Sequence, residues 1–424
     1  MSRVLRYVAF VAFLATIIAL ARPSFAANPD CGENTGQKAT GKPIPIGVLA
    51  SITGLGTTKE STEATKAYFD CVNANGGIHG RPIVYLVEDD QGKVDVGAQV
   101  AKKLVHDDNV YAIVGGLSAS DCVANSQYYA AQNIVDVGQG IALQCFQSRN
   151  MADINAGARQ GGIAIADYAR RKLGAKSIAC WIPKYPGADY ICGGVEQWGQ
   201  KYGVKVTSFY GDPSSIDASS VVLQILASGA DAAVLFGTDD IGAQLLNAAE
   251  EQDGAAKMKW LAAGGYYTAR LPGAINSKYW NNRFWVNLEF APLDSKGADN
   301  QNWLSVLDAY GGNTLRDTFS QASYVAARFV VRALLTIKNP EDINRNTVTA
   351  AIQNAPPYST DILCRPWYWG GADAQTHNAN HTTRTAIIRD GHWREVEGCQ
   401  PDPDPGLAPI LATETKLGIS NPEK

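Results

Sequence analysis

The sequence lacks several features that mark other classes of protein. It has no block of basic residues and a formal net charge of −4, so we do not expect it to bind nucleic acid. It has no Cys-x-x-Cys motif, which argues against a metal site built on cysteine. Beyond the N-terminal segment, it has no apolar run long enough to cross a bilayer.

The N-terminal segment has the three parts of a secretory signal. Arg3 and Arg6 precede an apolar run over residues 7–21, and small residues mark a cleavage site after Ala26. The run of about 15 residues is short for a membrane span, which needs about 20. We therefore expect residues 1–26 to be removed, leaving a soluble protein that is periplasmic or otherwise exported. The alternative is that the segment is retained as an anchor.

The cysteines occur in an even number, as expected for disulfides in an exported protein. Eight cysteines allow 105 pairings, but the expected helices and strands narrow the choice. Two cysteines follow neighbouring strands, two lie in one strand–helix unit, and two flank the C-terminal strand pair. The remaining two would join the N-terminal arm to the first helix. These positions favour four pairs: Cys31 with Cys71, Cys122 with Cys145, Cys180 with Cys192, and Cys364 with Cys399.

Apolar strands alternate with helical patterns through most of the chain, which predicts parallel sheets with right-handed crossovers. One run of strands and helices spans residues 44–138, and a second of similar size spans 156–265. Residues 300–354 are expected to be mainly helical, and 363–396 to form a hairpin-like strand pair. The proline-rich residues 400–424 are expected to leave the sheet and form a tail. The fold class expected is α/β, with two doubly wound lobes.

The loops that follow the expected strands are rich in small and hydroxyl-bearing residues. In open parallel sheets, ligands gather beyond the carboxyl ends of the strands, where small residues let a ligand approach the backbone. One such loop alone is a tight turn, but several in matching positions predict a binding cleft. These loops are Ser51–Gly54, Gly115–Ser120, Gly138–Gly140, Gly237–Asp240 and Gly264–Tyr267.

No motif predicts a nucleotide cofactor. A run resembling a P-loop at residues 36–42 is followed by Pro43, where a Ser or Thr would be needed to hold magnesium. The turn at residues 54–56 follows a strand as a dinucleotide loop would, but Lys59 stands where the third glycine is required. We therefore expect no cofactor.

No set of side chains predicts catalysis or metal binding. The loop at residues 116–120 resembles a nucleophile elbow but lacks its closing glycine. His377 and His381 are four residues apart, a spacing that suits a metal only on a helix, and their surroundings have the composition of a loop. We therefore do not expect an enzyme or a metal site.

The order of several short motifs resembles that of the type I periplasmic solute-binding proteins. Within them, it is most similar to the branched-chain amino acid (Leu/Ile/Val-binding) branch that serves ABC transporters. An apolar strand is followed by the Ser-Ile-Thr-Gly loop at residues 51–54, a helix, the turn at 73–81, and a strand that ends in acids at 88–90. The resemblance covers residues 43–396.

This resemblance implies two Rossmann-like lobes joined by a hinge of three strands. One lobe would hold residues 43–154 and 291–358, and the other 155–290 and 359–399. In the family, the lobes close about the hinge on a small-molecule ligand, which an inner-membrane ABC permease then receives. We expect the same function here, in a monomer.

The resemblance also implies which loops contact the ligand. Hydroxyls and backbone N–H groups of the first lobe would hold a carboxylate, and an acid or aromatic residues of the second lobe would hold an ammonium group and a side chain. The matching positions are Ser51, Thr53, Ser118, Ala119, Ser120 and Gln139 in the first lobe, and Tyr185, Tyr190, Asp239, Tyr266 and Tyr267 in the second.

Two departures from the family pattern leave the ligand open. Gln139 stands where the amino acid binders have smaller residues, and Asp121 with Cys122 replaces a small or hydroxyl-bearing pair. An ammonium-bearing ligand would need an ionised Asp239, whereas a neutral or aromatic acid would rely on Gln139 and the tyrosines. The sequence thus predicts a small polar ligand, an amino acid or a related carboxylate or amide.

Two other classes of function remain open on the same fold. A sensor ectodomain or accessory subunit would bind a ligand without delivering it, and a retained N-terminal anchor would favour that function. An exported enzyme would need a catalytic set, which the sequence does not show.

Overall fold

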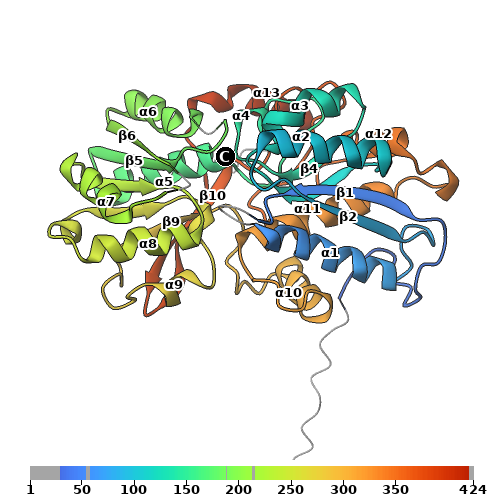
Figure 1. Cartoon of the computed structure of the whole chain (residues 1–424), viewed down its shortest axis with the longest axis horizontal. Coiled ribbons are helices and arrows are strands. Elements are labelled where there is room, and N and C mark those ends of the chain that lie inside the picture. The colour runs from blue at the N-terminus through green and yellow to red at the C-terminus, as the bar shows by residue number, and fades with distance from the viewer. Residues whose placement is uncertain (1–28, 54–57, 188, 213–214, 420–424) are drawn as a thin grey trace, which may run out of the picture.

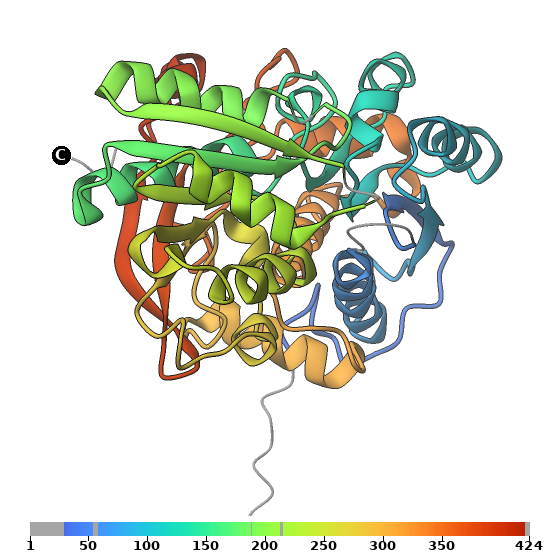
Figure 2. The same cartoon turned by 60° about the vertical axis from the view of Figure 1, so that its left-hand side comes forward.

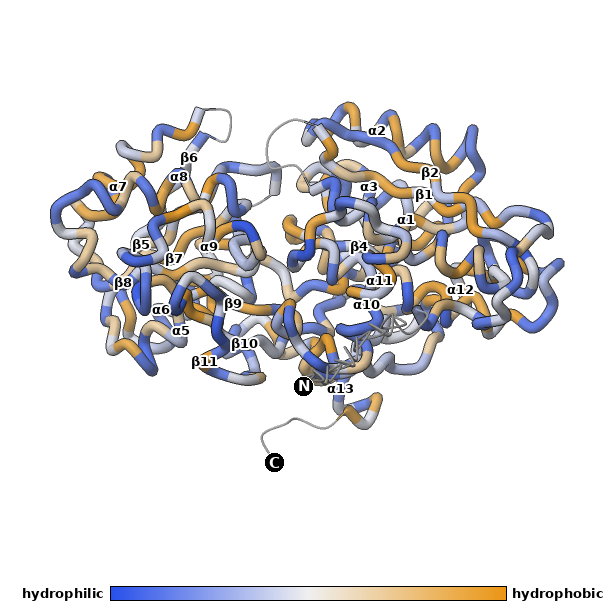
Figure 3. Tube along the Cα trace, turned by 90° about the horizontal axis from the view of Figure 1, so that it is seen from below, coloured by the Kyte–Doolittle hydropathy of each residue, from blue (hydrophilic) through white to orange (hydrophobic). Residues whose placement is uncertain are grey.

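The computed structural model describes residues 29–53, 58–187, 189–212 and 215–419. The expected signal segment at 1–26 and the turn at 54–56 lie outside these residues. The described chain forms two lobes side by side, each built on its own β-sheet with helices packed against it (Figure 1). Apolar segments run through the interior of both lobes (Figure 3). No helix within these ranges is long and apolar enough to cross a membrane.

The first lobe is built on a parallel four-stranded sheet. Its strands are parallel, as the alternation of apolar strands and helices predicted, and they occur in the order β2-β1-β3-β4. β1 is apolar and almost wholly buried, which suits a strand covered on both faces. The strands are β1 (Ile44–Ala50), β2 (Ile83–Asp89), β3 (Ile113–Leu117) and β4 (Asp136–Gln139). The helices are α1 (Lys59–Ala74), α2 (Val94–Lys102), α3 (Asp121–Ala131), α4 (Leu143–Phe146), α10 (Ala298–Tyr310), α11 (Thr318–Leu334) and α12 (Arg345–Gln353).

The second lobe is built on a mixed seven-stranded sheet in the order β11-β10-β9-β8-β7-β5-β6. Five strands are parallel, while β10 and β11 form an antiparallel hairpin that adds to β9, so that the C-terminal strands lie beside the middle of the chain (Figure 2). The strands are β5 (Ser177–Pro183), β6 (Lys205–Gly211), β7 (Ala232–Leu235), β8 (Lys259–Ala262), β9 (Phe284–Leu288), β10 (Thr382–Arg389) and β11 (His392–Pro401). The helices are α5 (Ala158–Leu173), α6 (Tyr190–Tyr202), α7 (Ala218–Ala227), α8 (Asp239–Glu250) and α9 (Leu271–Ala274).

Short helical turns complete the described secondary structure. Most are single 3-10 turns in connections, and one is a π-helical turn that extends α2. They are η1 (Lys103–Asp107), η2 (Ala255–Lys257), η3 (Gly264–Tyr266), η4 (Pro340–Asp342) and η5 (Pro405–Leu407).

Three connections carry the chain between the lobes. They run from β4 to α5, from β9 to α10, and from α12 to β10. Part of the last connection, between Ile362 and Ala379, packs in the core of the four-stranded sheet. The predicted lobe limits, which placed residues 359–399 with the second lobe, stay a prediction.

The turn between α1 and β2 closes the first strand–helix–strand unit of the first lobe. Gly77 has a φ of 65°, and a Cβ there would lie 2.3 Å from the carbonyl oxygen of Arg81, so the turn needs glycine. The Arg81 side chain donates to the carbonyl oxygens of Lys42 and Pro43 and thereby ties the turn to the start of β1. The glycine pair that ends the first helix is therefore a structural feature.

The four expected disulfides are all present, and no described cysteine is free. The pairs join residues 40, 23, 12 and 35 positions apart, in chain order. Each such link restricts the unfolded chain and typically contributes about 2–4 kcal/mol to stability.

The C-terminal residues differ from the expected tail. β11 extends to Pro401, which pairs with Thr382; a proline fits there because β11 is an edge strand. The chain then forms helix α13 (Ala408–Leu417), which lies at the junction of the lobes (Figure 1). Composition alone did not reveal the buried ion pairs, described below, that hold this segment in place.

Candidate functional site

A cavity of about 370 Å³ lies between the two lobes at the carboxyl ends of their strands. The described residues that line it come from both sheets and from the connections between them. From the first lobe they are Ser51, Thr58, Gln91, Gly92, Lys93, Leu117, Ala119, Gln139, Gly140, Ile141, Thr318 and Phe319. From the connections and the second lobe they are Asn155, Ala158, Ile182, Tyr185, Pro186, Phe236, Gly237, Thr238, Ala263, Gly264, Gly265, Glu289 and Phe290.

Apolar and aromatic side chains make up much of the cavity wall. Tyr185 and Phe236 line it from the second lobe, and Phe319 from the start of α11 in the first. A Cβ at Gly265 would lie 3.6 Å from the Phe319 ring, so the lobes are in contact at this edge. Such a volume and lining suit a small molecule with an apolar body.

Four of the predicted site residues line the cavity, namely Ser51, Ala119, Gln139 and Tyr185. Gln139 is held firmly, because its side-chain nitrogen donates to the carbonyl oxygen of Phe319 at 3.0 Å and to Ser323 Oγ at 2.7 Å. Its oxygen is thus the atom left for a ligand. That these residues bind a ligand stays a prediction.

The serines expected to hold a ligand carboxylate instead donate hydrogen bonds to a carboxylate of the protein itself, that of Asp90. Asp90 is fully buried and accepts hydrogen bonds from the hydroxyls of Ser51, Ser118 and Ser120. Ser118 Oγ also accepts the backbone N–H groups of Ser120 and Asp121 at 3.1 and 3.0 Å. Ser118 and Ser120 therefore lie beside the cavity without lining it.

Thr53 also lies outside the cavity lining. It is exposed, and its hydroxyl and backbone N–H both donate to Asp89, the last residue of β2. The loop after β1 is thus fixed to the neighbouring strand.

The remaining predicted residues of the second lobe make contacts within the protein. Asp239 is buried and accepts from the Arg270 guanidinium and the Thr268 hydroxyl, beside a separate pocket of about 140 Å³. The Tyr266 hydroxyl donates to the carbonyl oxygen of Phe236, and the Tyr267 hydroxyl accepts from the backbone N–H of Leu293. The Tyr190 hydroxyl donates to the carbonyl oxygen of Ile141, across the cleft.

Glu289, directly after β9, is a buried acid in the cavity wall that the sequence did not predict. Burial raises its pKa to about 7, although backbone N–H groups of Ala156 and Gly157 favour the charged form. The signal was the apolar run at residues 284–288, which we did not predict as a strand. Recognising it would have placed Glu289 at a strand end beside the cleft.

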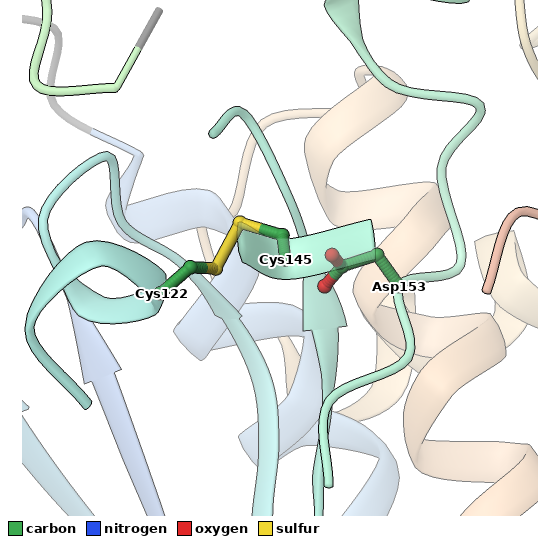
Figure 4. Close-up of side chains that lie close together, drawn as sticks. All are labelled: Cys122, Cys145 and Asp153. Carbon is green, nitrogen blue, oxygen red and sulfur yellow. A yellow bond between two sulfur atoms is a disulfide. The ribbon is translucent and has the colours of Figure 1, made fainter. Parts of the chain in front are cut away.

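Three further carboxyl groups are buried behind the cavity. Burial raises the pKa of Asp121 to about 6, and it raises the pKa values of Asp136 and Asp153 well above their usual range. Asp153 lies beside the disulfide of Cys122 and Cys145 (Figure 4). Because both sulfur atoms are bonded to each other, this grouping is not arranged to bind a metal.

Comparison with known proteins identifies the family. A family model described as "Periplasmic binding protein" matches residues 43–392. The chain belongs to the periplasmic binding proteins. The predicted resemblance to their type I, branched-chain amino acid branch is confirmed by this match together with the relatives and structures that follow.

Two relatives share low sequence identity with this periplasmic binding protein. An "Amino acid binding protein" of Pseudomonas aeruginosa is 25% identical over 215 residues, which make up 49% of this chain and 58% of that protein. A "Leu/Ile/Val-binding protein homolog 7" of Brucella abortus is 23% identical over 294 residues, 66% of this chain and 73% of that one. The match thus spans less than two thirds of the Pseudomonas protein.

Solved structures share the fold over most of the chain. A fatty acid ABC transporter substrate-binding protein from Thermomonospora curvata has a TM-score of 0.75 at 18% identity and covers 88% of this chain and 95% of its own. A solute-binding protein from R. palustris in complex with 4-hydroxybenzoate has a TM-score of 0.72 at 17% identity, with coverages of 87% and 100%. A substrate-binding protein from Streptococcus pneumoniae in complex with isoleucine has a TM-score of 0.69 at 16% identity, with coverages of 84% and 100%.

Proposed function

We propose that this protein is an exported solute-binding protein that captures a small polar ligand between its lobes and delivers it to an inner-membrane ABC permease. The ligand is an amino acid or a related carboxylate or amide. The observation that carries the proposal is the cavity of about 370 Å³ lined by strand ends of both sheets. A site divided between two lobes is complete only where the lobes come together.

Closure takes place about the three connections between the lobes. The proposal keeps the predicted lobe limits, residues 43–154 with 291–358 and 155–290 with 359–399. Contacts between Thr268 and Asp317 and between Tyr190 and Ile141 would break when the lobes separate. A ligand filling the cavity would add contacts with both lobes, so it is expected to stabilise the closed form.

The ligand contacts in this proposal are the four predicted residues that line the cavity. Gln139 and Ser51 supply polar atoms, Ala119 supplies backbone in the turn before α3, and Tyr185 covers the apolar part of the ligand. No catalytic step and no cofactor are assigned. The relatives described above as amino acid binding and the structures holding isoleucine or 4-hydroxybenzoate support this ligand range.

A thermal-shift screen of the mature protein, residues 27–424, tests the proposal. The panel holds aliphatic and aromatic amino acids, aromatic and dicarboxylic acids, amides, urea and polyamines, after refolding to strip any bound ligand. A ligand at 100 times its dissociation constant should stabilise the folded state by about 2.7 kcal/mol. Binding should also reduce the radius of gyration in X-ray scattering as the lobes close. A protein that none of these classes stabilises would contradict the proposal.

Export and maturation need a separate measurement. N-terminal sequencing of the protein recovered from a periplasmic extract should find Ala27 as the first residue. An intact N-terminus recovered with the membrane fraction would show a retained anchor and would favour a sensor.

A further inference from the structure

We propose that the cavity recognises a hydrogen-bond-donating nitrogen, an amide or a primary amine on a small apolar body, and that Glu289 receives this group. The inference rests on the proposed function, because it concerns the ligand held in the same cavity. It narrows the proposed ligand range, because it excludes a ligand whose carboxylate lies beside Glu289.

Four polar side chains of the cavity wall have their hydrogens in use within the protein. Ser51 donates to Asp90 at 2.9 Å, and Thr58 donates to the carbonyl oxygen of Leu117 at 2.9 Å. Gln139 uses both hydrogens of its amide nitrogen, and Thr238 donates to Asp240. Each therefore offers the cavity an oxygen, which accepts hydrogen bonds.

Glu289 adds a carboxylate oxygen to these acceptors. Its Oε2 accepts the backbone N–H of Ala156 at 2.9 Å, and none of the hydrogen bonds found in the described chain joins a side chain to Oε1. A Cβ at Gly264 or Gly161 would lie only 3.0 or 3.5 Å from Oε1, so bare backbone surrounds this atom. The residue is 7% exposed and lines the cavity. A ligand donor can reach this oxygen where no protein side chain does.

The charged groups around Glu289 do not supply a counter-charge. From α5, Arg159 is paired with Asp404, and from the segment before β10, His381 is paired with Glu414. Asp402, after β11, is a buried acid whose pKa is raised by burial and, to a smaller extent, by Glu289 itself. Among the described lining residues the cation is Lys93, which is exposed and bonded to Gln91 at the rim. Among the described lining residues, the charged group at the inner end of the cavity is thus the acid Glu289.

A ligand carboxylate would meet unfavourable neighbours at this end. The hydroxyls of Ser118 and Ser120, which suit an anion, are taken by Asp90. The hydroxyls of Thr318 and Tyr185 can donate or accept, so they do not distinguish the two kinds of ligand. An ammonium or amide nitrogen would instead supply the donors that Glu289 and Gln139 lack.

Three probes of the same shape test the inference: 3-phenylpropylamine, 3-phenylpropanamide and 3-phenylpropanoate. Calorimetric titration at pH 8 should show the amine or the amide binding at least tenfold tighter than the carboxylate. Tightest binding of the carboxylate would overturn the inference and leave the proposed function intact. If none of the three probes binds but another class of compound stabilises the protein in the thermal-shift screen, the inference is overturned and the proposed function stands. If no compound binds in either experiment, both the inference and the proposed function are overturned.

The pH dependence separates the amine from the amide. Because burial raises the pKa of Glu289 to about 7, an ammonium ion must displace a proton to pair with it at low pH. The amine's dissociation constant should therefore fall about tenfold between pH 6 and pH 8. The neutral amide should change by less than threefold. Amine binding that weakens as the pH rises would overturn the role of Glu289.

Two variants locate the effect. Glu289→Gln should weaken amine binding at pH 8 at least tenfold and remove its pH dependence. Asp153→Asn is the matched control, since it also removes a buried acid of raised pKa but does not line the cavity; it should leave the affinity within about twofold. If Glu289→Gln fails to fold, the pH titration of the wild-type protein still decides the question. Unchanged amine binding in a folded Glu289→Gln variant would overturn the inference.

Discussion

Asp90 and Glu289 are both buried carboxyl groups next to one cavity, yet their surroundings differ. Asp90 accepts hydroxyl hydrogens from three serines, so the protein itself satisfies its oxygens. Glu289 receives backbone N–H groups of Ala156 and Gly157, and no described side chain donates to it. A buried acid whose hydrogen bonds are made within the fold serves the structure. One that leaves an oxygen toward a cavity is available to a ligand.

The largest effect expected from this comparison is a loss of stability when Asp90 is replaced. Asp90→Ala leaves three buried hydroxyls without their acceptor, so we expect a loss of about 4 kcal/mol in the free energy of unfolding. Urea denaturation measures it, with Asp95→Asn, on the exposed first turn of α2, as the control. A loss below about 1 kcal/mol would show that the serines find other partners.

Glu289 should affect stability through pH. Its pKa is about 7 in the folded protein and near its usual 4.5 in the unfolded chain. Between these values the folded state holds a proton that the unfolded state has lost, so stability falls as the pH rises. From pH 4 to pH 8 this amounts to about 3 kcal/mol, which Glu289→Gln should remove.

The pH series should be run by urea denaturation on the wild type and on Glu63→Gln as well. Glu63 lies on α1 in a partly exposed pair with Lys59, so its removal should leave the pH slope unchanged. A Glu289→Gln slope equal to that of the wild type would contradict the assignment.

Ser118→Ala should produce a smaller loss, about 1.5 kcal/mol, because one hydroxyl bond to a charged group and the bonds it accepts from two backbone N–H groups disappear. Ligand affinity should stay within about threefold, since Ser118 does not line the cavity. A tenfold loss of ligand affinity with unchanged stability would show that Ser118 contacts the ligand. It would also contradict the view that the group around Asp90 serves the structure alone.

The smallest effect is expected at Thr53, which bonds the neighbouring acid Asp89 on the surface. Thr53→Ala should change the free energy of unfolding by no more than about 0.5 kcal/mol. Thermal denaturation beside the Ser118→Ala variant makes the comparison direct. A change above about 1.5 kcal/mol would mean that the surface loop contributes as much as the buried one.

The fold was predictable because its signals are local. Apolar strands such as β1 and the periodic helices that follow them recur in order, and the cysteines lie on elements whose neighbours could be inferred. The exception is β9, which stands between long loops and was not recognised. Missing this strand removed Glu289 from the predicted site.

The directions of the site side chains were less predictable because they depend on distant partners. Ser118 and Ser120 turn to Asp90, which lies 28 and 30 positions away in the sequence. Asp239 is engaged by Arg270 and Thr268 from the next loop. A pattern of residue types shows which loops meet, but the competition between an internal partner and a ligand appears only in three dimensions.

The C-terminal segment holds both lobes near the hinge. Asp404 pairs with Arg159 of α5 in the second lobe. On α13, Glu414 pairs with Arg365 and His381, next to Tyr368 in the core of the first lobe. A gene for expression should therefore extend past this segment. A chain that ends at residue 400 would lack Asp404 and Glu414, which pair with buried or partly buried basic side chains. A purification tag belongs after residue 424, and a fluorophore attached near α13 would test the proposed opening and closing from outside the cavity.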